Sequence, residues 1–94
     1  IWGGQRLTDG DLRYGWFMEP AILGNVTPAM KIAQEEVFGP VVALMAVENF
    51  DEAIAVANGV QYGLSASLVT RDLKKAMLYA ERIECGVVKV NQIS

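Results

Sequence analysis

Residues 34–47 read QEEVFGPVVALMAV, an acidic, turn-forming stretch followed by an unbroken apolar run from 41 to 47. A continuously apolar run of this kind is typical of a strand covered on both faces, as in the parallel sheets of α/β proteins. The residues before it are unusual at the start of a strand, because adjacent carboxylates repel each other and proline donates no ladder hydrogen bond. Since local rules are most often broken where function requires it, we expect a site in residues 34–40.

Strand and helix patterns alternate after this run, and their spacing predicts a βαβαβ unit with a parallel sheet and helices on its faces. Asn49, with Glu52 three positions on, is typical of a helix N-terminus. The expected elements are a strand at 41–47, a helix from Asn49 to Asn58-Gly59, a strand at 64–69, a helix capped by Thr70 or Asp72 and ended by Gly86, and a strand at 87–90. The apolar face of the second helix is expected to comprise Leu73, Ala76, Met77, Ala80 and Ile83.

Residues 1–40 lack this alternation and predict short extended segments ahead of the sheet. The turn signal Thr8-Asp9-Gly10 favours a hairpin, and Pro20 and Pro28 interrupt the extended pieces. Pro28 also suits the first position of a brief helical turn. We therefore expect one domain over 1–94, with extended segments and a site loop at 1–40 and the βαβαβ unit at 41–94.

Composition excludes several classes of function. A net charge of −3 and scattered basic residues argue against nucleic-acid binding, and no apolar run is long enough to span a membrane. The chain has no histidine, and we find no metal site. Its single cysteine, Cys85, forms no internal disulfide, which favours the reducing cytoplasm, and its position at a helix end favours an inert thiol.

Three residues are candidates for a site. Glu36 stands just before the buried strand, where a carboxylate can accept hydrogen bonds from the paired hydroxyls of a ribose, although the residues alone slightly favour a solvated loop acid. Phe38 can pack against a flat ring or close the edge of the sheet. Asn91 follows the third strand, at the edge where α/β sheets bind ligands, or it caps the backbone of the next loop.

The residues of this chain assemble no complete catalytic set, such as a Ser/His/Asp or Cys/His constellation. Several motifs nevertheless follow one another in a recognisable order. They are GWFMEPAI at 15–22, MKIAQEEVFGPV at 30–41, AN at 57–58, YGLSAS at 62–67, TRDL at 70–73 and GVVKVN at 86–91.

In this order the motifs resemble the C-terminal part of the catalytic domain of the NAD(P)-dependent aldehyde dehydrogenase superfamily, and the resemblance covers essentially the whole chain. It implies that Glu36, the second acid of the Glu-Glu-x-Phe-Gly-Pro motif, holds the hydroxyls of the nicotinamide ribose. It further implies that Phe38 lies against the nicotinamide side of NAD or NADP. Asn91 would begin the loop that lines the aldehyde pocket.

The resemblance also implies that the catalytic groups lie outside this segment. The family's nucleophilic cysteine, its general-base glutamate and its oxyanion asparagine would all precede Ile1, and Cys85 does not match the nucleophile's motif. We therefore expect a fragment, inactive alone, of a homo-oligomeric enzyme that oxidises an aldehyde, such as a semialdehyde, to an acid. The fragment's partners would be the rest of the catalytic domain, the aldehyde and the cofactor. The alternative is a non-catalytic α/β interaction or assembly module.

Overall fold

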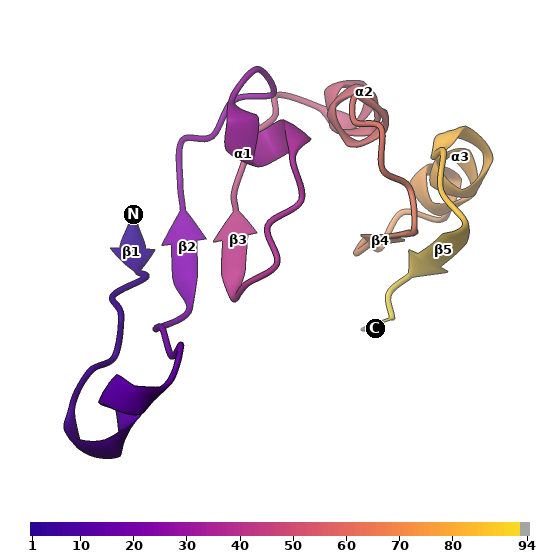
Figure 1. The fold of residues 1–94 in the computed structure, drawn as a ribbon. Helices are drawn as coiled ribbons and strands as arrows, with labels where there is room; N and C mark the ends of the chain where they lie inside the picture. The colour runs from indigo at the N-terminus through magenta and orange to yellow at the C-terminus, as the bar shows by residue number, and fades with distance from the viewer. Residues whose placement is uncertain (93–94) are drawn as a thin grey trace. The chain divides into compact units, whose positions relative to one another are not determined.

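The computed structural model describes residues 1–92. The chain divides into two compact units, Ile1–Ala46 and Val47–Ser94, each with its own sheet (Figure 1).

The first unit holds a three-stranded sheet in the order β1-β2-β3. β1 runs antiparallel to β2, whereas β2 runs parallel to β3, with Ala21 opposite Val41 and Leu23 opposite Ala43. A parallel pair requires a crossover connection, and here it carries a short helix. The elements are β1 (Trp2–Gly3), the 3₁₀ helix η1 (Gly10–Tyr14), β2 (Ala21–Leu23), α1 (Lys31–Gln34) and β3 (Val41–Ala43).

Between β1 and β2 the chain folds back on itself. Arg6 and Met18 form an antiparallel bridge, and the Leu7 amide donates to the Phe17 carbonyl at 2.9 Å. The 3₁₀ helix η1, rather than a tight two-residue turn, lies at the tip of this excursion. Gly10 at its start has φ +55°, a conformation that glycine adopts without steric cost.

The second unit is a βαβ unit, in which the helix α3 connects two parallel strands, with the helix α2 before it. Ser65 lies opposite Val87 and Leu68 opposite Val90. The elements are α2 (Phe50–Asn58), β4 (Ser65–Leu68), α3 (Leu73–Arg82) and β5 (Val87–Val90).

The core of the second unit forms where α2 meets α3. Ile54 from α2 is buried against Tyr79 and Ile83. Burial raises the pKa of the Tyr79 hydroxyl above its usual value of 10.0, and the nearby Cys85 thiol raises it further. Partly buried side chains complete the cluster: Phe50, Ala66, Leu68, Cys85 and Val90.

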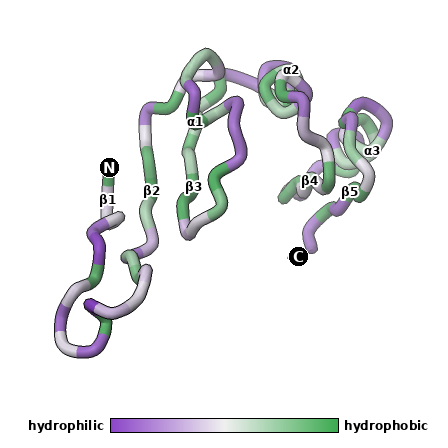
Figure 2. The backbone as a smooth tube through the Cα atoms, viewed as in Figure 1, coloured by the Kyte–Doolittle hydropathy of each residue, from purple (hydrophilic) through white to green (hydrophobic). Residues whose placement is uncertain are grey.

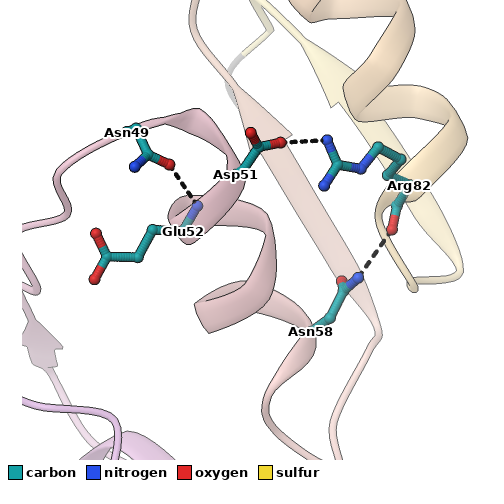
Figure 3. Close-up of polar contacts among 5 residues, drawn as sticks. All are labelled: Asn49, Asp51, Glu52, Asn58 and Arg82. Carbon is teal, nitrogen blue, oxygen red and sulfur yellow. Dashed lines mark hydrogen bonds and ion pairs between the residues drawn. The ribbon is translucent and has the colours of Figure 1, made fainter.

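Side chains cap the starts of both helices in this unit, as the sequence predicts. The Asn49 side-chain oxygen accepts from the Glu52 amide at 2.9 Å (Figure 3), and Glu52 in turn accepts from the Glu48 amide at 2.6 Å. This is a capping box displaced by one residue. Of the two candidate caps of α3, the structure selects Asp72, whose carboxylate accepts from the Lys75 amide at 3.1 Å.

The α2–α3 contact also has a polar part. The Asn58 amide nitrogen donates to the Arg82 carbonyl at 2.8 Å, and its oxygen accepts from the Glu84 amide at 3.0 Å. Arg82 pairs with Asp51 at 2.6 Å (Figure 3). α3 therefore ends at Arg82, before the predicted Gly86, because Asn58 binds the backbone on both sides of its terminus.

The α/β class and the order of the elements are confirmed, and the expected strands form parallel pairs within each unit. β3 pairs with β2, and β4 pairs with β5 in a separate sheet. Beyond β3, the Leu44 amide still donates to the Leu23 carbonyl at 2.8 Å. An apolar run indicates a strand but does not show which strand it pairs with. The apolar segment at residues 21–23 is too short for a strand to be predicted from it.

The expected buried face of α3 is partly wrong. Ile83 is buried, but Leu73 and Met77 are 76% and 66% exposed, and Tyr79 takes the central place in the core. α3 carries apolar residues on more than one side, so helical spacing alone does not decide which side packs on α2.

Candidate functional site

The loop at residues 35–40 connects α1 to β3 and is held by local backbone hydrogen bonds. The Gly39 amide donates to the Val37 carbonyl at 2.9 Å, and the Val41 amide donates to the Gly39 carbonyl at 2.8 Å. Each closes a three-residue γ-turn, a feature common where a strand begins. The Pro40 carbonyl accepts from the Ala21 amide at 2.8 Å, which fixes the end of the loop to β2.

Along this connection the chain changes from hydrophilic to hydrophobic residues (Figure 2). Its two acids have different surroundings. Glu35 caps the end of α1 and pairs with Lys31 at 3.5 Å, an exposed contact one helical turn apart. Glu36 is exposed, and its carboxylate has no partner among residues 1–92. A free carboxylate presents two acceptor oxygens, enough for both hydroxyls of a diol.

Phe38 lies at the centre of the first γ-turn, between the two residues whose backbones are bonded. Its ring is 94% exposed, so it does not close the edge of the sheet, which was the alternative interpretation. A ring this exposed gains little from the fold and is available to pack against a flat partner.

An open pocket of about 300 Å³ adjoins the loop. Its volume is at the lower limit of ligand sites in general, which span roughly 300–1,000 Å³. Glu36 lines it together with residues from α1 and the loop: Lys31, Ile32, Glu35 and Val37.

Asn91 lies in the second unit, directly after β5. Its backbone has φ +54°, and its side-chain amide pairs with the backbone of Thr70 in both directions. The Thr70 amide donates to the Asn91 side-chain oxygen at 2.8 Å, and the Asn91 side-chain nitrogen donates to the Thr70 carbonyl at 2.8 Å. Asn91 therefore binds the backbone that follows β4, rather than the backbone of the next loop.

Thr70 was missed as a partner of Asn91, because the two are far apart in the sequence and meet only when β4 and β5 pair. Ser67 was missed for the same reason: its hydroxyl donates to the Gln92 carbonyl at 3.1 Å. Cys85 is partly buried, and its thiol donates to the Val87 carbonyl at 3.2 Å, which agrees with an inert role.

Within residues 1–92, no group of three or more His, Cys, Asp or Glu side chains is arranged to hold a metal ion. No helix in that range is long and apolar enough to cross a membrane.

The model of the aldehyde dehydrogenase family matches residues 1–94, the full chain. The chain belongs to the aldehyde dehydrogenase family. An α-ketoglutarate semialdehyde dehydrogenase of Haloferax volcanii is 58% identical over 77 residues, which is 82% of this chain and 16% of that protein. An α-ketoglutaric semialdehyde dehydrogenase of Bacillus subtilis is 44% identical over 89 residues, 95% of this chain and 18% of that protein.

Solved aldehyde dehydrogenases share the fold. The betaine aldehyde dehydrogenase of Staphylococcus aureus, in complex with NAD+, is 40% identical with a TM-score of 0.91 over 98% of this chain and 18% of its own. A mutant aldehyde dehydrogenase C of Pseudomonas syringae, in complex with NAD+ and octanal, is 40% identical with a TM-score of 0.82 over 89% of this chain and 17% of its own. This aldehyde dehydrogenase segment thus spans less than a fifth of these relatives.

Proposed function

We propose that this segment serves an enzyme that oxidises an aldehyde to a carboxylic acid with NAD+ or NADP+, and that its own part is to position the nicotinamide. The observation that carries this role is the loop at 35–40, where a carboxylate without an internal partner stands two residues from an almost fully exposed ring. Family membership supports the reaction, and the NAD+ complexes of related structures support NAD+ as the cofactor.

The proposed substrate class is a semialdehyde. The support is that two relatives, 58% and 44% identical over most of this chain, are named as semialdehyde dehydrogenases. A substrate of this class carries a second polar or charged group remote from the aldehyde.

Glu36 is the proposed ligand of the nicotinamide ribose. The residues fit this group, because the Glu36 oxygens are exposed and can accept from two neighbouring hydroxyls. Hydrogen bonds to an ionised acceptor are shorter and stronger than neutral ones. The hydrogen-bonded γ-turns limit the motion of the loop. The Glu36 carboxylate would therefore hold the ribose in a fixed position.

Phe38 is the proposed wall beside the nicotinamide. Its ring is held out from the γ-turn, and the following Gly39-Pro40 is fixed to β2 through the Pro40 carbonyl. The cofactor, when bound, supplies the acceptor for the hydride of the aldehyde carbon. The role of Glu36 and Phe38 is to set where that acceptor lies, and Asn91 would begin the loop of the aldehyde pocket.

The nucleophile would come from elsewhere in the enzyme. The thiol of Cys85 is bonded to a backbone carbonyl and packs beside the core of the second unit, and the chain has no histidine to act as its base.

The test of the cofactor role is Glu36→Gln in the full-length enzyme, with Glu35→Gln as the matched control. We expect the rate of NADH formation in a single turnover to fall by roughly a hundredfold for Glu36→Gln, the cost typical of a misplaced reactant. The Glu35→Gln variant should keep the wild-type rate, because Glu35 pairs with Lys31 on the surface. Wild-type NADH formation in Glu36→Gln would disprove the assignment.

A second proposed function, as an assembly surface of a homo-oligomer, is favoured by the exposed apolar side of α3. Leu73 and Met77, one helical turn apart, are 76% and 66% exposed. Sedimentation of the full-length Leu73→Glu and Met77→Glu variants tests it. We expect smaller assemblies than wild type, and an unchanged assembly would disprove this function.

A further inference from the structure

The β4–β5 sheet packs on the helices of its own unit through one face. α2 and α3 lie on one side of the two strands (Figure 1), where Ala66, Leu68 and Val90 pack against the buried core cluster. Side chains alternate along a strand, so the strand residues between these three point to the opposite side. We call that side the outer face, and its residues are Ser65, Ser67, Val87 and Lys89.

Lys89 is the only charged side chain of these four. It lies opposite Ser67 in the parallel register, one residue before β5 ends. The side chain is partly buried, but its ammonium group forms no hydrogen bond or ion pair with any residue among 1–92. An ammonium group has three donors and no acceptor. Lys89 therefore presents an unused positive charge on the outer face.

Parallel sheets occur almost only with both faces covered. The matches to this chain make up 16% and 18% of two semialdehyde dehydrogenases, so most of an enzyme of that length lies outside residues 1–94. A segment that covers the outer face removes water from Lys89. A buried charge requires a partner of opposite charge and hydrogen bonds, and a carboxylate supplies both.

We propose that the outer face is an interaction surface for a segment of the full-length polypeptide outside residues 1–94, and that this segment places a carboxylate against Lys89. The small side chains of Ser65 and Ser67 allow the covering segment to approach the sheet closely. The inference rests on one part of the proposed function, that this segment belongs to a longer enzyme, and it does not depend on the cofactor role of Glu36.

The experiment compares the full-length enzyme with three variants. Lys89→Met keeps an unbranched side chain and removes the ammonium group, whereas Lys89→Arg keeps the positive charge. Lys74→Met is the matched control, because Lys74 lies on α3 in the same unit, is exposed and has no ion pair with residues 1–92.

For Lys89→Met we expect the Tm at about pH 8 to fall by about 5 °C, because loss of one partner of a buried pair leaves the other charge uncompensated. Lys89→Arg should recover most of this loss. Lys74→Met should stay within about 1 °C of wild type, as expected for an exposed side chain.

The pH dependence of the Tm shows whether the partner is a carboxylate. Without Lys89, burial raises the pKa of the uncompensated carboxyl group above its usual value of about 4. Its charge then lowers stability at about pH 8, and this loss disappears as the pH falls through the raised pKa. The Tm difference between Lys89→Met and wild type should therefore shrink towards about pH 5. Ser67 and Val87, beside Lys89 on the outer face, do not titrate in this range.

Acetylation of the wild-type enzyme tests the covered face even if Lys89→Met does not fold. Lys89 should react roughly tenfold more slowly than Lys74, because a covered amine reacts only through local opening. Equal rates overturn the proposal. Zero-length cross-linking of amines to carboxylates then locates the partner. A Lys89 product with an acid outside residues 1–94 of the same polypeptide supports the proposal, and one with an acid inside that range overturns it.

Three other results also overturn the proposal. A Tm for Lys89→Met equal to or above that of wild type would show that Lys89 has no buried partner. Smaller assemblies in sedimentation would assign the acid to a second copy of the chain. A raised KM for the aldehyde or Kd for NAD+ with wild-type Tm would assign the negative charge to a ligand. Wild-type NADH formation in Glu36→Gln disproves the cofactor role and leaves these Tm values unaffected, so the two failures are distinguishable.

Discussion

The loop at 35–40 and the end of β5 are the two places that the sequence marks as a site, and the structure treats them in opposite ways. In the loop, Glu36 has no partner among the described residues and Phe38 is 94% exposed. After β5, both ends of the Asn91 amide are paired with Thr70.

The difference separates two kinds of functional residue. A side chain that binds a ligand directly keeps its polar groups available, so the fold gains little from it. A side chain that positions other residues uses its polar atoms in hydrogen bonds within the protein. Its removal therefore changes the local backbone first. This comparison supports the proposed contact role of Glu36, whereas both polar ends of the Asn91 side chain are taken up by the backbone of Thr70.

The largest expected effect on stability is that of Ile54→Ala, which tests whether the second unit depends on its core. Ile54 is 6% exposed between Tyr79 and Ile83, so its truncation should cost about 3 kcal/mol in the free energy of unfolding. Denaturant unfolding of the full-length protein measures it. Val69→Ala, at a residue 85% exposed in the same unit, should stay within about 0.5 kcal/mol of wild type.

A smaller effect, and one on binding alone, is expected for Phe38→Ala. The loss of a ring contact with the nicotinamide should weaken NAD+ binding by roughly tenfold, equivalent to about 1.4 kcal/mol. The Tm should not change, because the ring is 94% exposed. Calorimetric titration with NAD+ gives the affinity, and Leu64→Ala, at an 85% exposed side chain, is the control. A lower Tm with unchanged NAD+ affinity would contradict this prediction, because it would show that Phe38 has a structural role and no contact with the cofactor.

The smallest effect is expected where both polar partners are exposed. The Asp51–Arg82 pair is short, at 2.6 Å, but the two side chains are 76% and 39% exposed. Asp51→Asn should therefore lower the free energy of unfolding by only about 0.5 kcal/mol. A double-mutant cycle with Arg82→Gln measures the coupling, and a value above about 2 kcal/mol would show that exposure is a poor guide to the importance of a contact in this chain.

Features set by neighbouring residues could be predicted from the sequence. The Asn49 cap, the strand at 87–90 and the apolar start of β3 depend on a few adjacent side chains, and each lies where the sequence predicts it. The unusual character of residues 35–40 was also visible, because its charge, aromatic ring and proline conflict locally.

Features set by distant residues could not be predicted. The pairing of β3 with β2 depends on which backbone groups meet across a crossover, and apolar runs carry no information on that choice. The pairing of Asn91 with Thr70 arises only because β4 and β5 lie in parallel register. The proposed roles of Glu36 and Phe38 come from the ordered motifs of the family, since the residues alone slightly favoured a solvated acid at Glu36.

The most direct test of the contact role of Glu36 combines the variant with a changed cofactor. Single-turnover hydride transfer is measured for wild type and Glu36→Gln, each with NAD+ and with an analogue that lacks both hydroxyls of the nicotinamide ribose. If Glu36 binds those hydroxyls, the analogue slows the wild type about as much as the variant does with NAD+, and the two changes together cost little more than either alone. Fully additive losses would contradict the account, because they would show that the carboxylate and the hydroxyls act independently.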